Sequence, residues 1–202
     1  MRHPIFRMPR RFLRRAAETV LLLVAAASLA CGGGGSGGGD NGPAFKCSDS
    51  PVGVDTVALV CGTKISGNTW SLKVVIEGPV TSADISGFNF DVVFPASDLS
   101  YVPGSAEVGT YFSQGGSVAL FAAGLASNDP GRLVVGIQLP DQAVPVQGGP
   151  GQNLIMTFRL KANALTAFGP DLIRFENAEA VDSAKAAIES VSFSDQLLLS
   201  VQ

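Results

Sequence analysis

The sequence predicts an all-β fold in which two sheets pack face to face as a sandwich. From residue 54 onward, short apolar runs with alternating polar positions follow one another, and no apolar repeat of 3.6 residues is sustained. Glycine, proline, asparagine or aspartate interrupts the pattern about every ten residues. We count nine predicted strands after the glycine-rich run, a number and spacing typical of a two-sheet sandwich.

The clearest strand is predicted at residues 69–77. Trp70, Leu72, Val74 and Ile76 fall on one face of it, because successive side chains of a strand point to opposite faces. We expect this apolar face, including the one tryptophan, to belong to the core.

A second strand with the same alternation is predicted at residues 88–94. Phe88, Phe90, Val92 and Phe94 lie on its apolar face, and Asn89, Asp91 and Val93 lie on the other. The remaining strands are predicted at residues 54–60, 99–106, 117–124, 131–139, 152–162, 171–181 and 191–201.

Turn-forming residues separate these strands at residues 78–79, 103–104, 128–131 and 148–151. The Asn128 and Asp129 pair also suits a calcium loop in residue type. The DxDxDG spacing of such loops is absent, however, and Asn and Asp side chains cap their own turns. We therefore predict a turn and no metal site at this position.

Residues 1–30 are predicted to be an export leader. Residues 1–19 contain six arginines and one glutamate, and residues 20–30 are an unbroken apolar run that ends before Cys31. This run is shorter than the ~20 apolar residues that a membrane-spanning helix needs. The leader resembles the signal peptides of bacterial lipoproteins, which implies that Cys31 carries a lipid. Ordinary secretion, with Cys31 free or paired, is the alternative.

A lipidated cysteine and a glycine-rich tether are predicted over residues 31–43, followed by one domain at residues 44–202. The run GGGGSGGG at residues 32–39 has almost no side chains to bury and is typical of flexible coil. We expect the domain to be anchored in the cell envelope, facing the periplasm or the exterior. The outer membrane is favoured, since Gly32 and Gly33 stand where inner-membrane lipoproteins commonly have aspartate.

Composition argues against several classes of function. Without the leader, eight basic and sixteen acidic residues remain, a net charge of −8, which disfavours nucleic acid as a partner. The one histidine, His3, lies in the leader. The domain therefore has no Ser-His-Asp or Cys-His pair and no imidazole ligand for a metal. No carboxylate pair stands out for glycoside chemistry, and we predict neither enzymatic activity nor a cofactor.

Cys47 and Cys61 are predicted to form a disulfide. They are an even pair in a chain expected to be exported, where oxidation is favoured. A metal site is disfavoured, since two cysteines without histidine fill only half of a tetrahedral shell.

Several segments, taken in order, resemble the strands of cohesin domains. Residues 86–94 (SGFNFDVVF) resemble the third cohesin strand, and residues 99–105 (LSYVPGS) the fourth. Residues 131–137 (GRLVVGI) resemble the sixth, and residues 154–161 (LIMTFRLK) and 173–178 (IRFENA) resemble later strands. The resemblance spans nearly all of the predicted domain and implies a nine-stranded jelly-roll sandwich.

The resemblance also implies binding in place of catalysis. In cohesins, a sheet that includes the third, fifth and sixth strands receives a calcium-loaded dockerin helix pair, so Asn89 and Asp91 are implied as protein-contact residues. The alternative is carbohydrate binding, as in the polysaccharide-degrading systems that contain cohesins, with Tyr101 and Tyr111 as the candidate stacking residues. A structural envelope protein without a discrete ligand is a third hypothesis.

Overall fold

The computed structural model describes residues 45–49, 51–78, 84–113, 116, 118–140, 148–163, 173–195 and 197–201. The predicted leader, the predicted lipid site at Cys31 and the glycine-rich tether lie outside the described residues. No helix within the described ranges has both the length and the apolar character that crossing a membrane requires.

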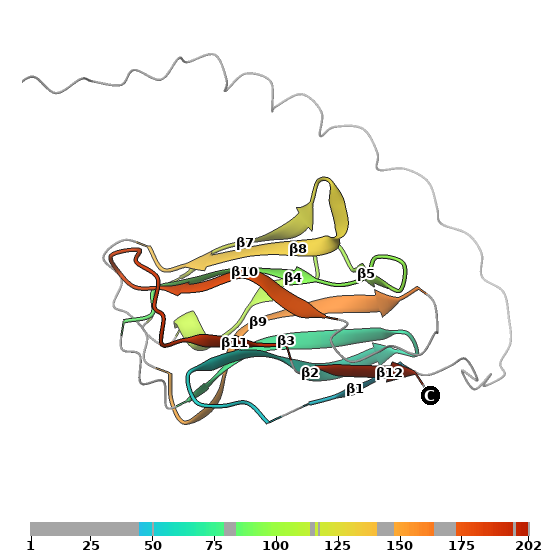
Figure 1. The fold of residues 1–202 in the computed structure, drawn as a ribbon, viewed down its shortest axis with the longest axis horizontal. Coiled ribbons are helices and arrows are strands. Elements are labelled where there is room, and N and C mark those ends of the chain that lie inside the picture. The colour runs from blue at the N-terminus through green and yellow to red at the C-terminus, as the bar shows by residue number, and fades with distance from the viewer. Residues whose placement is uncertain are drawn as a thin grey trace, which may run out of the picture. The chain divides into compact units, whose positions relative to one another are not determined.

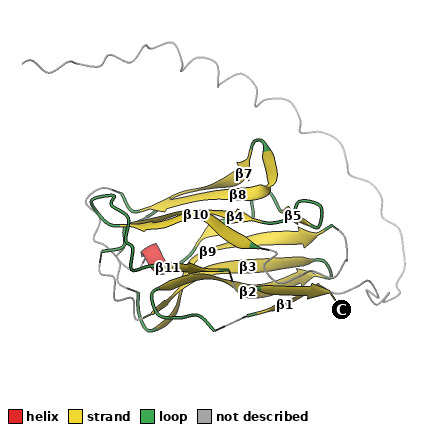
Figure 2. Cartoon of the chain, viewed as in Figure 1, coloured by secondary structure: helices red, strands yellow, loops and turns green. Residues whose placement is uncertain are grey.

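Two sheets face each other and form the layers of a β-sandwich (Figures 1 and 2). The four-stranded sheet has the order β10 (Arg174–Val181), β4 (Gly87–Val93), β8 (Asp129–Gln138) and β7 (Leu120–Ala126), with every neighbouring pair antiparallel. The six-stranded sheet has the order β11 (Ser192–Ser194), β2 (Thr56–Ser66), β3 (Thr69–Gly78), β9 (Gly151–Ala162) and β5 (Leu99–Tyr101), and β6 (Glu107–Val108) also pairs with β9. A short 3-10 helix, η1, spans Tyr111–Ser113.

The core lies between the two sheets and is rich in aromatic residues. Phe88, Phe90, Val92 and Phe94 are each at most 3% exposed, which confirms the apolar face predicted for residues 88–94. Phe90 of β4 packs edge-on against Phe175 of β10, with ring centroids 5.4 Å apart. Because the Phe90 side chain points into the core, the polar residues that alternate with the phenylalanines along β4 lie on the outer side of the sheet.

The predicted all-β sandwich is confirmed, but the predicted count of nine strands is not, because the described residues contain twelve. The strand expected at 99–106 shortens to β5, since the chain turns at Gly104, whose φ is +73°. The strand expected at 191–201 is divided into β11 and β12 (Leu198–Val201), which belong to different sheets. No strand was predicted at β1 (Phe45–Ser48), which pairs with β12.

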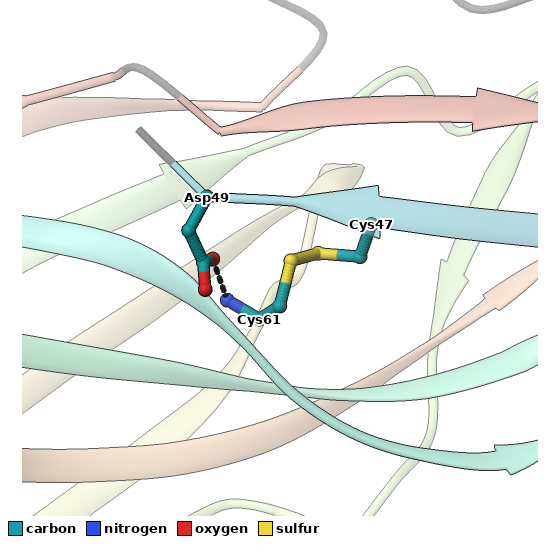
Figure 3. The surroundings of a disulfide bond; sticks show 3 residues. All are labelled: Cys47, Asp49 and Cys61. Atoms are coloured by element: carbon teal, nitrogen blue, oxygen red, sulfur yellow. Dashed lines mark hydrogen bonds between the residues drawn. A yellow bond between two sulfur atoms is a disulfide. The ribbon is translucent and has the colours of Figure 1, made fainter. Parts of the chain in front are cut away.

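The predicted disulfide between Cys47 of β1 and Cys61 of β2 is present, with the two Cα atoms 5.8 Å apart (Figure 3). The Asp49 carboxylate accepts a hydrogen bond from the backbone N–H of Cys61. In the described part of the chain, Cys47, Asp49 and Cys61 form a group of potential metal ligands. Because both sulfurs are bonded to each other, neither is a thiolate, and the group is structural.

Candidate functional site

The candidate site lies on the outer face of the four-stranded sheet. Strand pairing arranges the outward side chains in rows, since directly opposed residues of paired strands point to the same side. One row runs through Glu179, Asn89, Gly136 and Ala122, and the next runs through Glu176, Asp91, Val134 and Gly124. In these two rows the face is polar over β10 and β4, and small or apolar over β8 and β7.

A hollow of about 600 Å³ opens on this face. It is lined by residues of β4, β7 and β8 and by Asn177 of β10: Asn89, Phe90, Asp91, Ala122, Ala123, Gly124, Leu125, Val134, Val135, Gly136 and Asn177. Its floor is low because glycines lack side chains. A Cβ added at Gly124 would meet no atom within 4 Å, and one added at Gly136 would meet only Asn89 Oδ1 at 3.6 Å.

The apolar half of the face is exposed. Val134 is 45% exposed at the centre of this half, and Leu120 on β7, whose side chain points to the same side of the sheet, is 66% exposed. Exposed apolar groups gathered beside a hollow are typical of a surface that contacts another molecule.

The polar half is held by an ion-pair network centred on Arg132 of β8. Its Nη1 donates to Asp91 at 2.7 Å, its Nη2 donates to Glu176 at 2.7 Å, and its Nε donates to Asp129 at 3.2 Å. These carboxylates, Asp91 first and Glu176 next, raise the pKa of Arg132 above its already high ordinary value. The guanidinium thereby links β4, β8 and β10 and fixes this half of the face.

Asn177 completes the network from a bulge in β10. The register between β10 and β4 shifts between Glu176 and Glu179, and Asn177 has a φ of +49°. Asparagine tolerates this left-handed conformation better than most residues do. Its Nδ2 donates to Asp91 at 2.7 Å, so the bulge turns an amide toward the centre of the sheet.

Asn89 and Asp91, which the sequence resemblance implied as protein-contact residues, have different environments. Asn89 is exposed, and its amide donates to Glu179 at 3.0 Å. Asp91 lies on the same face, but only 8% of it is exposed, and it accepts from Arg132 and Asn177. Asp91 therefore serves to position its neighbours, and little of its surface is left for a partner.

The sequence did not point to Arg132, Glu176, Asn177 or Glu179. They come from β8, which begins 36 residues after the end of β4, and from β10, which lies further along the chain, so strand pairing alone brings them together. The sequence did contain a signal for this network. Arg132 stands near the start of an otherwise apolar strand, and an isolated charge at such a position requires a partner.

Tyr101 and Tyr111, the candidates for stacking on sugars, are buried. Tyr111 is 0% exposed and packs edge-on against Phe112, and burial raises the pKa of its phenol. Tyr101 is 8% exposed, and its hydroxyl accepts from the N–H of Ala106. Neither ring faces solvent, so neither can stack on a sugar. The strongly exposed large apolar side chains of the described residues are all aliphatic.

The ion pairs predict a pH dependence of stability. Hydrogen bonds from Arg132 and then Arg174 hold the pKa of Glu176 below its ordinary value. A lowered folded-state pKa contributes stability above about pH 4.3, and this contribution is lost as the pH falls through the folded-state pKa. Glu176→Gln is therefore expected to melt at a lower temperature than the wild type at pH 7, and the difference is expected to shrink toward pH 3.

Thermal melts of both proteins from pH 7 to pH 3 measure this effect. Glu107→Gln is the matched control, since Glu107 is exposed and takes part in no ion pair among the described residues. A difference between wild type and Glu176→Gln that stays constant over the whole range would contradict the assignment.

Comparisons with known proteins identify the fold. No protein-family model matches the sequence, and no curated protein matches it. Solved structures do match. A type II cohesin domain from the cellulosome of Acetivibrio cellulolyticus has a TM-score of 0.50 at 13% identity, with 75% of this chain and 95% of that chain covered.

Two further structures from Acetivibrio cellulolyticus agree. A type II cohesin–X–dockerin complex gives a TM-score of 0.51 at 10% identity, covering 69% of this chain and 93% of the matched chain. A type II cohesin dyad from an adaptor scaffoldin gives 0.50 at 15% identity, covering 72% of this chain and 47% of that one. The described chain therefore has the β-sandwich fold of cohesin domains, as the order of its sequence segments implied.

Proposed function

We propose that this chain is a non-catalytic binding module that receives a protein partner on the hollow outer face of β10, β4, β8 and β7. The observation that carries the proposal is the hollow, floored by Ala122, Gly124 and Gly136 and flanked by exposed Val134. The cohesin fold supports it, since a matched structure was solved as a complex with a dockerin.

The shape of the face suits a helical partner. A floor of glycine and alanine lets the backbone of another element approach closely, and a helix with its side chains is about 10 Å across. The partner's apolar side chains would contact Val134, which is 45% exposed on this face. Its polar side chains would meet Asn89 and Glu179 at the edge of the hollow, which already hydrogen-bond to each other.

The charges on this face suit binding better than catalysis. A general acid needs a carboxyl group with a raised pKa, usually in an apolar site. The pKa of Glu176 is instead lowered by two arginines, and Asp91 accepts a hydrogen bond from Arg132. The two arginines hold Glu176 ionised, as in a structural network.

We further propose that the module is displayed in the cell envelope through a lipid on Cys31, with the glycine-rich run as a tether. The apolar leader and its closing cysteine support this location, as does the disulfide, which suits an oxidising compartment. A fatty acid detected by mass spectrometry on Cys31 of the mature chain tests it, and an unmodified Cys31 contradicts it.

Calorimetric titration with a panel of calcium-loaded type II dockerin modules tests the binding proposal. Val134→Glu places a charge at the centre of the apolar half, and Gly124→Phe fills the hollow where a Cβ meets open space. Each is expected to weaken binding at least about 100-fold, a loss of the size seen when a hot-spot residue at the centre of an interface is replaced. Lys161→Glu is the control, since it changes an exposed charge on the six-stranded sheet.

Equal loss of binding by the control variant would contradict the location of the site. If no dockerin binds, or if soluble oligosaccharides displace a dockerin that does, the protein-binding proposal fails.

A further inference from the structure

The two edge strands of the four-stranded sheet, β10 and β7, differ in how well they are protected against pairing with another chain. β10 carries Arg174, Glu176 and Glu179 and contains a bulge, features that keep an edge strand from pairing with another chain. β7 (Leu120–Ala126, LFAAGLA) has no charged residue and no proline, and it pairs with β8 in unbroken register from Leu120 to Leu125. The open side of β7 is thus a regular, uncharged row of backbone donors and acceptors.

Apolar side chains gather at this edge. Val118 is 83% exposed, Leu120 is 66% exposed and Leu125 is 40% exposed, and Val134 on the adjoining strand is 45% exposed. These are four of the seven large apolar side chains that are strongly exposed in the described residues. Figure 1 shows β7 as the outermost strand of its layer. An edge of this composition is one that proteins normally pair or cover.

We propose that β7 pairs with β7 of a second copy of this chain, antiparallel across a two-fold axis, to form a continuous eight-stranded sheet. Two copies carry the same net charge and repel each other, and this repulsion opposes close approach least at an edge that carries no charged residue. β7 is such an edge, whereas β10 carries three charged residues and a bulge.

The side chains of β7 suit self-pairing. With the axis at Ala123, Phe121 lies opposite Leu125 on the inner side of the sheet, and Ala122 lies opposite Gly124 on the outer side. Large apolar side chains therefore lie opposite large apolar side chains, and small residues lie opposite small residues. The hollows of the two copies would then lie on one continuous face.

The size of this contact sets its strength. Seven paired residues span about 24 Å, and a strip roughly 10 Å wide on each copy gives roughly 500 Å² of buried surface in total. Stable interfaces bury about 1,200 Å² or more. The dimer is accordingly weak and depends on concentration, and copies held close together on one surface would favour it.

Cysteine cross-linking of the full chain tests this pairing. In a Cys31→Ser background, Cys47 and Cys61 remain bonded to each other, and one introduced cysteine supplies the free thiol. Ala123→Cys places two thiols opposite each other at the axis, and Ala122→Cys does so if the axis lies one residue earlier. Leu120→Cys is the control, because Leu120 is 66% exposed but lies opposite Ala126 or Gly124 in these registers.

After mild oxidation, a disulfide-linked dimer is expected on a non-reducing gel for one of Ala123→Cys and Ala122→Cys, but not for Leu120→Cys. Adding Gly124→Lys, which has open space for its side chain, is expected to abolish the dimer through like-charge repulsion. Absence of a dimer at both positions, equal cross-linking at all three, or a dimer that survives Gly124→Lys would overturn the proposal. Dockerin binding by the monomer is a separate measurement and stands or falls independently.

Discussion

Replacing Phe90 with alanine is expected to lower the free energy of unfolding by about 3–5 kcal/mol, the usual cost of truncating a buried phenylalanine. Phe90 is 1% exposed, packs edge-on against Phe175 and contacts Phe193 with centroids 6.4 Å apart. Phe193 belongs to β11 of the six-stranded sheet, so this cluster joins the two layers. Removing the central ring leaves a cavity that three strands share.

Denaturant unfolding of wild type and variant measures this loss, which is a large part of the 5–15 kcal/mol that stabilises a typical domain. Leu120→Ala is the matched control. It also truncates an apolar side chain of the four-stranded sheet, but one that is 66% exposed, so a change within about 0.5 kcal/mol is expected. Similar losses for the two variants would contradict the proposed core.

Phe90 also connects the core to the site, because it lines the hollow from below. Its truncation is therefore expected to weaken partner binding beyond the loss explained by unfolded protein. The packing that stabilises the sandwich and the shape of the binding face thus depend on the same ring.

Loss of the disulfide through Cys47→Ser combined with Cys61→Ser is expected to destabilise the domain by about 3 kcal/mol, the value for a closed loop of about 15 residues. The two cysteines are 14 positions apart in the sequence. The disulfide joins β1 to β2, whereas the hydrogen-bonded partner of β1 is β12, near the opposite end of the chain. Without it, the β1–β12 pair loses its disulfide cross-link to β2 and is joined to the six-stranded sheet by the backbone alone.

The unfolding midpoint of the double variant in denaturant, compared with that of the oxidised wild type, measures this contribution. Cys31→Ser is the control, since it makes the same substitution at a cysteine outside the disulfide and is expected to leave the midpoint unchanged. A double variant as stable as the control would show that the β1–β12 pair needs no such link.

Much of the fold follows from local pattern. The alternation at residues 88–94 assigned each side chain of β4 to the correct side of the sheet, since the two-residue period of a strand is a property of the strand itself. The same period places Tyr101 on the side of buried Leu99, so a stricter application to residues 99–101 would have placed that tyrosine in the core. Tyr111 lies in the η1 turn, where no such period applies.

The sequence by itself determined the all-β class, the buried and exposed faces of the clearest strands and the pairing of Cys47 with Cys61. Only the tertiary structure decided that Asp91 is enclosed by Arg132 and Asn177, and that glycines of β7 and β8 form a hollow beside it. The reason is physical. Which face a side chain takes depends on its own strand, whereas what surrounds it depends on which distant strands become neighbours.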